Sequence, residues 1–383
     1  MDSAPHAGKH RPSRGKARVS AWLTRHWQRR GLSLALLPLA PLALLFAALA
    51  ALRRFLYRHT WLRCVALPVP VVVVGNLGVG GTGKTPLVLY IAQSLQAAGW
   101  RPGILSRGYG RLRGASEPCP VFPHSDPAQV GDEPVLLALR GKLPVWVGRD
   151  RAAAGAALLA RHPDVDVLIC DDGLQHLRLR RDVEIAVFDG RGAGNGFLLP
   201  LGPLREPLSR LRGVDAVLFN GAPDARVLAA CAGGKGFDMR LLPGAFYRLD
   251  NPGICCTADD FAAKRLGALA GIGHPERFFR TLEQMGLLFS AHAFPDHHAY
   301  QSADLSSLPC EVLLMTEKDG VKCARFSAAP GMPELWALPV TASLPPDFFN
   351  FLLEKLKWTQ NSSTSSSAPS ARANCCTRKS SRN

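Results

Sequence analysis

The sequence predicts an α/β fold in which a mostly parallel sheet is flanked by helices. Short apolar runs alternate with helical patterns along the chain, which is the order that crossover connections give to a parallel sheet. The 383 residues are 47% hydrophobic and 20% charged, so the chain can bury a substantial core. This length corresponds to about two domains. Ligands of such folds bind at the carboxyl ends of the strands, so polar residues at those positions are candidates for function.

The elements expected before about residue 222 alternate between strand and helix. They are strands near 69–76, 103–106, 145–147, 165–170, 184–188 and 216–219, and helices near 84–98, 133–140 and 151–161. After about residue 222 the pattern restarts with strands at 266–272, 311–315 and 335–339 and helices at 274–285 and 347–358. We therefore expect a second, smaller α/β lobe.

Charge and cysteine content narrow the classes of partner. The net charge is +16, but residues 1–30 carry eight Lys/Arg against one Asp, and residues 357–383 carry five Lys/Arg and no acid. Two basic ends on a nearly neutral body favour a membrane surface over a nucleic-acid groove, so we expect no nucleic-acid partner. The ten cysteines form no C-x-x-C pair, which argues against a zinc site and is typical of reduced cytosolic thiols.

Residues 31–52 form an apolar stretch of 22 residues without a charge. A helix of that length could cross a bilayer core of about 30 Å. A cleaved signal peptide and a buried core helix are the alternatives, but the basic leader is long for the first and the uncharged length is unusual for the second. Because both flanks are basic and Pro38 and Pro41 would kink a helix, a helix lying in the cytoplasmic leaflet is slightly favoured over a spanning one.

A phosphate-binding motif follows the first strand. The P-loop pattern G-x-x-x-x-G-K-[ST] is satisfied by Gly78, Val79, Gly80, Gly81, Thr82, Gly83, Lys84 and Thr85. Glycines let backbone N–H groups converge on phosphate oxygens, and the helix that follows adds its positive N-terminal end. Lys84 is expected to bridge the β- and γ-phosphates, and Thr85 to bind Mg²⁺. A chance glycine-rich turn is the alternative, but the flanking strand and helix are both in place.

A metal partner is expected at the end of another strand. The apolar run 165–170 leads into Asp171 and Asp172, the position of the companion carboxylate in P-loop enzymes. One is expected to hold Mg²⁺ while the other orients a neighbour, and a simple acidic turn is the alternative. Residues 316–319 read Thr-Glu-Lys-Asp, which lacks the spacing of the guanine motif N-K-x-D. ATP is therefore the expected nucleotide.

Further polar clusters fall just after apolar strands, at 106–110, 131–134, 149–151, 175–176, 204–206 and 294–298. As a set they supply what phosphoryl transfer to a hydroxyl requires: a base, a His that orients it, and Arg groups for anionic ligands. Each cluster alone is more often a turn or a surface group. A membrane-associated P-loop ATPase or GTPase that acts as a switch or chaperone is the alternative class of function.

Six short motifs, in one order, resemble those of the tetraacyldisaccharide 4'-kinases, the lipid A 4'-kinases of Gram-negative bacteria. They are G-x-G-G-T-G-K-T-P, S-R-G-Y-G, G-D-E-P, D-D-G-x-Q-H, P-L-R-E and F-x-D-H, and the resemblance covers about residues 35–357. It implies a P-loop NTPase-like kinase of two α/β lobes that uses Mg-ATP to phosphorylate the 4'-hydroxyl of a tetraacylated glucosamine disaccharide 1-phosphate. It also implies an N-terminal hydrophobic membrane helix at the cytoplasmic face of the bacterial inner membrane. No obligate protein partner is inferred.

The resemblance also implies roles for individual residues. Asp132 would accept the proton of the sugar hydroxyl, and His297 would pair with it, with His298 a less favoured alternative. Lys84 would act in catalysis as well as in nucleotide binding, and Asp171 and Asp172 would serve Mg²⁺. The residues expected to line the acceptor or phosphate site are Arg107, Tyr109, Arg151, Gln175, His176, Arg205 and Glu206.

The chain is thus expected to have five parts. They are a basic disordered leader over residues 1–30, a membrane-associated helix over 31–60, a P-loop kinase domain over 61–215, a second α/β lobe over 216–358 and a disordered tail over 359–383. A lipid with four acyl chains leaves a bilayer only at a cost of about 0.8 kcal/mol per buried CH₂. An enzyme acting on such a lipid would therefore have to meet it at the membrane.

Overall fold

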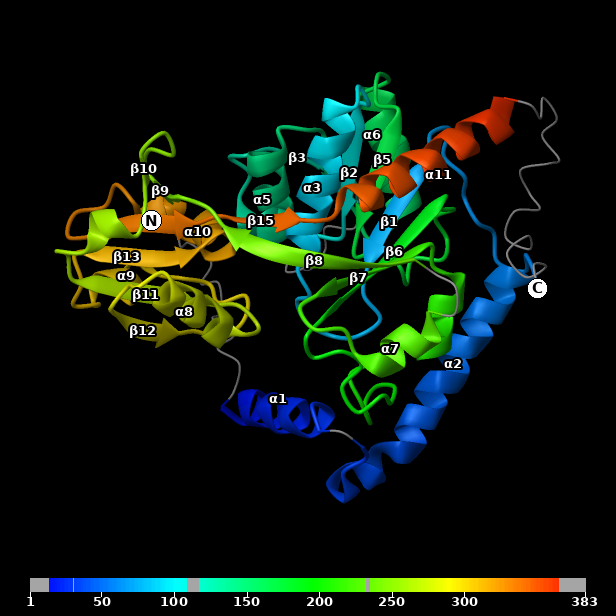
Figure 1. Ribbon diagram of the computed structural model, residues 1–383, viewed down its shortest axis with the longest axis horizontal. Coiled ribbons are helices and arrows are strands. Elements are labelled where there is room, and N and C mark those ends of the chain that lie inside the picture. The colour runs from blue at the N-terminus through cyan, green and yellow to red at the C-terminus, as the bar shows by residue number, and fades with distance from the viewer. Residues whose placement is uncertain (1–13, 30, 109–116, 232–234, 365–383) are drawn as a thin grey trace, which may run out of the picture.

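The computed structural model describes residues 14–29, 31–108, 117–231 and 235–364. Over these residues the chain forms two α/β lobes and a pair of N-terminal helices (Figure 1). Within the described residues the first lobe is built on a sheet of nine strands and the second on a sheet of six. The predicted fold class, a mostly parallel sheet flanked by helices with a second smaller lobe, is confirmed.

The central strand of the first sheet, β1 (Val71–Gly75), is buried along its whole length. Its run of valines suits a strand that helices cover on both faces. The order across the sheet is β15 (Val340–Ser343), β8 (Lys235–Pro243), β7 (Ala216–Asn220), β6 (Val183–Asp189), β1, β5 (Val167–Asp171), β2 (Pro102–Ser106), β4 (Val145–Val147) and β3 (Cys119–Val121). The edge strands β3 and β15 pair antiparallel with their neighbours, and β1 pairs in parallel with both β5 and β6.

Helices cover both faces of this sheet. Apolar side chains of α3 (Lys84–Ala97), α5 (Asp132–Gly141) and α11 (Pro346–Thr364) form the core on one face. The core on the other face includes α6 (Arg151–Arg161), α7 (Ala225–Ala230) and the 3₁₀ segment η2 (Leu208–Gly213). A short helix, α4 (Pro127–Val130), precedes α5. The helices predicted at 84–98, 133–140 and 151–161 are confirmed to within one residue at each end.

The second sheet has the order β10 (Cys255–Cys256), β9 (Phe246–Arg248), β14 (Glu334–Leu338), β13 (Val312–Thr316), β11 (Leu266–Ala270) and β12 (Phe289–Ala293). Strands β14, β13, β11 and β12 run in parallel. The helices of this lobe are α8 (Pro275–Gln284), α9 (Ser302–Ser306) and α10 (Glu317–Cys323), with 3₁₀ turns η3 (Asp259–Phe261) and η4 (Ala324–Phe326).

The sheets divide the chain differently from the expected boundary after residue 215. Strand β7 pairs with β6, and β8 extends the same sheet, so both strands belong to the first lobe. Strand β15 returns to pair with β8, and α11 packs on the first sheet. Figure 1 shows β8 and β15 running between the lobes. An apolar run is a local signal, whereas the pairing that assigns a strand to a sheet is made between distant residues.

Helix α1 (Arg14–Trp27) occupies part of the leader that the sequence predicted to be disordered, so that prediction is wrong for these residues. The indole N–H of Trp27 donates to the carbonyl oxygen of Pro200 at 3.0 Å, which docks α1 on the first lobe. At the other end of the chain, α11 continues into the predicted disordered tail as far as Thr364. The rest of that tail lies outside the described residues.

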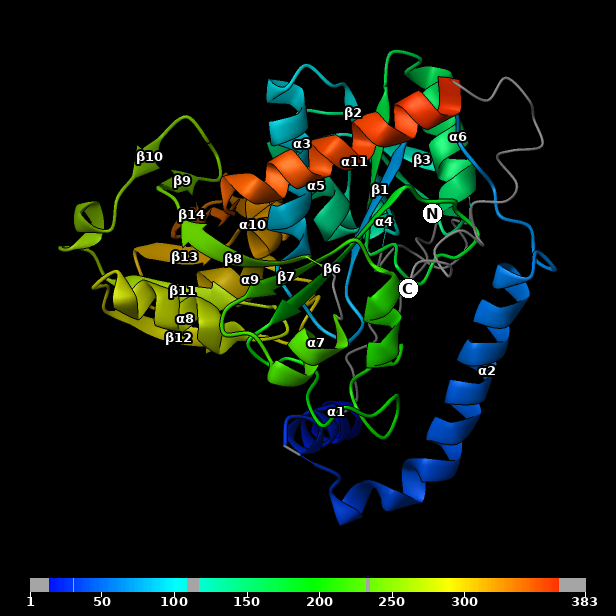
Figure 2. The same cartoon turned by 45° about the vertical axis from the view of Figure 1, so that its right-hand side comes forward.

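The apolar stretch forms the 3₁₀ segment η1 (Leu34–Leu39) and helix α2 (Ala40–Arg58). Figure 2 shows α2 extending away from the two lobes. The segment Leu34–Arg58 is long and apolar enough to cross a membrane, with a mean hydropathy of 2.4 and 11% of its most apolar window buried. A core helix of a soluble protein would be mostly buried. The low burial therefore favours a membrane-associated helix.

Candidate active site

The phosphate loop connects the buried strand β1 to helix α3. Gly80 has a φ of +99°, a left-handed backbone conformation that favours glycine. The Asn76 side chain donates to the carbonyl oxygen of Gly80 at 3.1 Å, and Asn220, at the end of β7, donates to that of Thr82 at 3.2 Å. Helix α3 begins at Lys84, so its positive N-terminal end adjoins the loop. The local geometry is therefore that of a phosphate cradle.

An arginine that the sequence analysis did not single out lies against this loop. Arg191 follows β6, and its guanidinium donates to the carbonyl oxygen of Gly81 at 2.9 Å and to Asp189 Oδ2 at 2.9 Å. It also donates to Nε2 of His274, in the second lobe, at 2.6 Å. Burial and the nearby arginines lower the pKa of His274, which keeps its ring neutral and able to accept. The position of Arg191 just after the apolar strand β6 is the sequence feature that could have identified it.

The two aspartates after β5 lie in different environments. Asp172 is 3.5 Å from Lys84 Nζ and 3.2 Å from an Arg205 nitrogen. Burial would raise the pKa of Asp172, but these two cations outweigh it and lower the pKa. Asp171 is 2% exposed, and burial, together with the charge of Glu133, raises its pKa to about 7. Asp171 is therefore the carboxylate whose negative charge is less compensated.

Buried polar atoms without a partner mark the same place. Asn76 Oδ1, Thr82 Oγ1 and Asp171 Oδ1 are buried and lack a hydrogen-bond partner among the described residues. Native proteins seldom leave such atoms unmet, so they indicate a bound ligand. The donor set fits Mg²⁺, which takes one or two protein carboxylates and completes its shell with phosphate oxygens and water. Such a site needs no larger cluster, and the described part of the chain contains no group of three or more His, Cys, Asp or Glu that could hold a metal.

The predicted base and its partner come together from opposite lobes. Asp132 begins α5, and its Oδ2 lies 3.1 Å from Nδ1 of His297, which follows β12. Asp132 Oδ1 accepts the backbone N–H of Glu133 at 2.9 Å. Burial would raise the pKa of Asp132, but the His297 hydrogen bond and a nearby lysine lower it overall. His298 instead lies 3.1 Å from Asp304, so the less favoured alternative is not brought to the base.

The two sheets present the carboxyl ends of their parallel strands to one region. Strands β1, β5 and β6 of the first lobe lead into the phosphate loop, the acidic pair and the arginine described above. Strands β11 and β12, which are parallel neighbours in the second lobe, lead to His274 and His297. The charges of Lys84 and Glu133 both act on Asp171. The phosphate loop, the acidic pair and the predicted base therefore belong to one site.

Two of the predicted acceptor residues lie beside the phosphate loop. Gln175 donates to the carbonyl oxygen of Asn76 at 3.0 Å, and its Oε1 accepts from Arg205 at 3.2 Å. Arg107 follows β2 and is exposed. Tyr109 lies outside the described residues.

Arg151 and His176 form a second predicted group. Arg151 is fully buried, and its guanidinium donates to the carbonyl oxygen of Gly148 at 2.7 Å. Its other two nitrogens have no hydrogen-bond partner among the described residues. Burial and the charge of Arg151 lower the pKa of His176 to about 4, so the His176 ring is neutral at pH 7. This pair can therefore offer a guanidinium for an anion and a neutral imidazole.

Glu206 pairs with two arginines of the chain. It is 6% exposed, and its Oε2 lies 3.3 Å from Nε of Arg210 and 3.9 Å from a nitrogen of Arg54. Because Arg54 belongs to α2, Glu206 links the apolar helix to the first lobe. No local sequence pattern indicates this contact, since the two residues are far apart in the chain.

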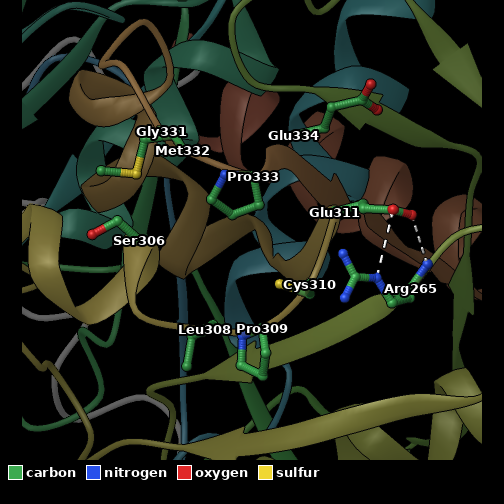
Figure 3. A pocket seen from close by; sticks show the side chains of 10 residues that line it. All are labelled: Arg265, Ser306, Leu308, Pro309, Cys310, Glu311, Gly331, Met332, Pro333 and Glu334. Carbon is green, nitrogen blue, oxygen red and sulfur yellow. Dashed lines mark hydrogen bonds and ion pairs between the residues drawn. The ribbon is translucent and has the colours of Figure 1, made fainter.

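An open hollow of 490 Å³ lies elsewhere on the second lobe (Figure 3). Its lining includes Arg265, which precedes β11, Glu311, which precedes β13, and Glu334, which begins β14. Arg265 and Glu311 form an ion pair at 3.5 Å. These positions are the amino ends of the strands, whereas the site residues follow the carboxyl ends. The hollow is therefore separate from the candidate active site.

Comparison with known proteins decides the family. The family model of tetraacyldisaccharide-1-P 4'-kinase matches residues 35–357. The chain belongs to this family. The tetraacyldisaccharide 4'-kinase of Dechloromonas aromatica is 54% identical, over 89% of this chain and 99% of its own length. The enzyme of the same name from Chromobacterium violaceum is 51% identical, over 88% of this chain and 98% of its own length.

A solved structure supports the same family. The crystal structure of LpxK from Aquifex aeolicus in complex with ATP matches this chain with a TM-score of 0.70 and 29% identity, covering 84% of this chain and 100% of that chain. Membership of the tetraacyldisaccharide-1-P 4'-kinase family confirms the resemblance drawn from the six motifs. The chain is therefore a kinase with a P-loop NTPase-like fold.

Proposed function

We propose that this chain transfers the γ-phosphoryl group of ATP to the 4'-hydroxyl of a tetraacylated glucosamine disaccharide 1-phosphate, which yields lipid IVA in lipid A biosynthesis. The family match over residues 35–357 supports the reaction. In the structure, the supporting observation is the meeting of a phosphate loop with the Asp132–His297 pair at the facing edges of two lobes. A kinase needs a triphosphate cradle and a group that accepts the alcohol proton within one site.

Asp132 is the proposed base. His297 holds its Oδ2 and the Glu133 backbone holds its Oδ1, so the carboxylate cannot rotate away from the acceptor. Because its pKa is lowered, Asp132 is ionised at neutral pH. The proton moves from the acceptor hydroxyl to a remaining lone pair of Asp132, while His297 keeps the carboxylate oriented. Since the hydroxyl loses its proton late in a loose transition state, a carboxylate of modest basicity suffices.

Residues 78–85 carry the nucleotide side of the site. Backbone N–H groups and Lys84 would bind the β- and γ-phosphates, and Thr85 and Asp171 would hold Mg²⁺. Mg²⁺ supplies neutralisation of the charge on the phosphate oxygens when it is bound. Asp172 would orient the two cations that it already pairs with. Arg191 would keep the loop in shape through its bond to a loop carbonyl.

The acceptor would reach this site from the membrane. The apolar segment Leu34–Arg58 is proposed to hold the chain at the cytoplasmic face of the inner membrane, where ATP is present and the acyl chains can stay in the bilayer. Guanidinium groups suit the 1-phosphate because they bind phosphate oxygens in pairs. The residues proposed to line the acceptor or phosphate site are Arg107, Tyr109, Arg151, Gln175, His176, Arg205 and Glu206.

The test is phosphate transfer in a defined mixture. Purified protein, Mg-ATP labelled in the γ-phosphate and the tetraacylated disaccharide 1-phosphate should give a labelled lipid that is heavier by one phosphate in mass spectrometry. The matched control is Lys84→Met, which keeps the chain but removes the phosphate-binding ammonium. Rapid ATP hydrolysis that does not depend on lipid, without any labelled lipid, would contradict the proposal and favour a P-loop switch.

A further inference from the structure

Helix α10 begins in the segment 316–319, which lacks the spacing of a guanine motif. The fold uses these side chains in other ways. Thr316 caps the helix by accepting the Asp319 amide N–H at 3.2 Å, and Glu317 forms an ion pair with Arg140 of α5. Asp319 is fully buried and accepts a backbone N–H from the loop after β11 at 3.0 Å. The start of α10 is thus fixed in the second lobe and docked on the first. The remaining side chain of the segment is that of Lys318.

That side chain, Lys318, joins the two lobes beside the proposed base. Its Nζ lies 3.1 Å from Glu133 Oε1 on α5 and 3.6 Å from Asp296 Oδ1 in the loop after β12. Glu133 is the chain neighbour of Asp132, and Asp296 is the chain neighbour of His297. One ammonium group therefore holds the neighbours of both members of the base pair. The Lys318 side chain is 18% exposed, whereas those of Glu133 and Asp296 are 36% and 44% exposed, so the ammonium is largely shielded while water still reaches both carboxylates.

We propose that Lys318 is a positioning residue for phosphoryl transfer, which clamps α5 to the loop after β12 and so sets the Asp132–His297 contact. This inference rests on the function proposed above for that pair. His297 has a φ of +58°, a conformation that non-glycine residues seldom adopt, so the loop needs contacts that hold it. The ion pair of Lys318 with the preceding residue of the loop is such a contact.

The charges that face Asp132 support this role. The start of α5 contributes Glu133, the loop after β12 contributes Asp296 and the imidazole of the pair, and α10 contributes Lys318 and Lys322. Lys322 lies 2.9 Å from the buried carboxylate of its own helix, so Lys318 is the α10 lysine that faces the base. Burial raises the pKa of Asp132, while the imidazole hydrogen bond and the charge of Lys318 lower it. Removal of the ammonium should therefore raise the pKa of Asp132.

The test compares three variants of the full chain. Lys318→Met removes the ammonium, and Lys318→Arg keeps a cation. Glu317→Gln is the matched control, because it weakens a neighbouring ion pair between the same two helices without touching the base pair. The kcat and KM for ATP and for acceptor lipid are measured from about pH 5 to pH 9, with thermal unfolding of each variant. Amide hydrogen exchange of peptides covering residues 294–300 is followed without substrates.

We expect Lys318→Met to lower kcat by about 10- to 100-fold, the scale of a misplacement of roughly 1 Å, with the KM for ATP changed by less than about threefold. The acid limb of its pH profile should move to higher pH, because the base is then protonated at higher pH. Exchange in 294–300 should quicken. Lys318→Arg should restore part of the rate, and Glu317→Gln should leave the limb in place. In a His297→Ala background, Lys318→Met should lower kcat by a smaller factor than in the wild type, because both substitutions act on the Asp132–His297 contact.

Two results would overturn the inference. One is a Lys318→Met enzyme with an unshifted acid limb and unchanged exchange in 294–300 while the wild type phosphorylates the lipid. The other is a Glu317→Gln enzyme that loses as much kcat as Lys318→Met and shows the same shift of its acid limb. Both ion pairs would then be general contacts between the lobes. Failure of the wild type to phosphorylate any acceptor lipid would overturn the proposed function itself. The exchange experiment would still report whether Lys318 holds the loop, so the two failures can be told apart.

Discussion

Asp132→Asn is the substitution that most sharply separates chemistry from binding at this site. Asparagine has nearly the same shape and can still meet the imidazole that lies 3.1 Å from Asp132 Oδ2, but it cannot take the acceptor proton. A positioned general base contributes about 10²- to 10⁴-fold to a rate. We therefore expect kcat to fall by this factor, which corresponds to about 3–5 kcal/mol at 1.36 kcal/mol per tenfold. The KM for ATP should change little, because Asp132 lies on α5 and not on the phosphate loop.

The assay is steady-state transfer of labelled phosphate to the acceptor lipid, with nucleotide binding measured separately by calorimetry. The His297→Ala variant is the companion, since it leaves the carboxylate but removes the group that orients it. Its loss should be smaller than that of Asp132→Asn. A kcat for Asp132→Asn within about threefold of the wild type would refute the assignment of the base. A loss confined to ATP affinity would instead place Asp132 in nucleotide binding.

Three further predictions concern other parts of the molecule. Asp171→Asn should abolish Mg²⁺-dependent turnover yet raise the unfolding temperature, and the gain should be larger at pH 8 than at pH 5. Burial raises the pKa of Asp171 from 3.8 to about 7, so the wild-type protein loses stability as the pH rises from 3.8 toward 7, and the variant avoids this loss. Calorimetric unfolding of both proteins at pH 5 and pH 8 checks this prediction. Arg191→Met removes the bond to the Gly81 carbonyl and should raise the KM for ATP by about tenfold with the KM for lipid unchanged, as steady-state kinetics would show. The double variant Leu44→Asp and Leu49→Asp changes side chains on α2 that are 71% and 58% exposed, and should weaken vesicle flotation about 100-fold or more while the fold persists, because each charge in the bilayer core costs about 3 kcal/mol. Unchanged flotation would contradict a membrane role for α2.

The elements that were predicted best from the sequence are those whose patterns lie within a few neighbouring residues. The valine run of β1, the glycine motif and the helical period after it identified strand, loop and helix in order, because each depends on neighbouring residues. Asp132 and His297 were paired through the family resemblance, and the structure brings them to 3.1 Å. No local pattern could have joined them, since they are 165 residues apart and come from opposite lobes.

The features that the sequence did not predict depend on pairing between distant segments. Residues 235–243 and 340–343 fell within the predicted second lobe, and no strand was predicted at either place. They form β8 and β15, which pair in the first sheet. Strand β12, which carries the loop of His297, has no buried residue, and Ser290 and His292 interrupt its apolar residues, so it lacks the apolar run of a buried strand. Arg191 acquires its place only when β6 and the phosphate loop are neighbours. Helix α1 was missed because its basic composition resembles that of a disordered leader.

The most direct test of the central claim is regiochemical. Labelled ATP is offered with two acceptor lipids that differ only at the 4'-position, one bearing the hydroxyl and the other lacking it. The account predicts transfer to the hydroxyl-bearing lipid, loss of that transfer in Lys84→Met, and no label in the lipid without the hydroxyl. Equal labelling of both lipids would contradict it.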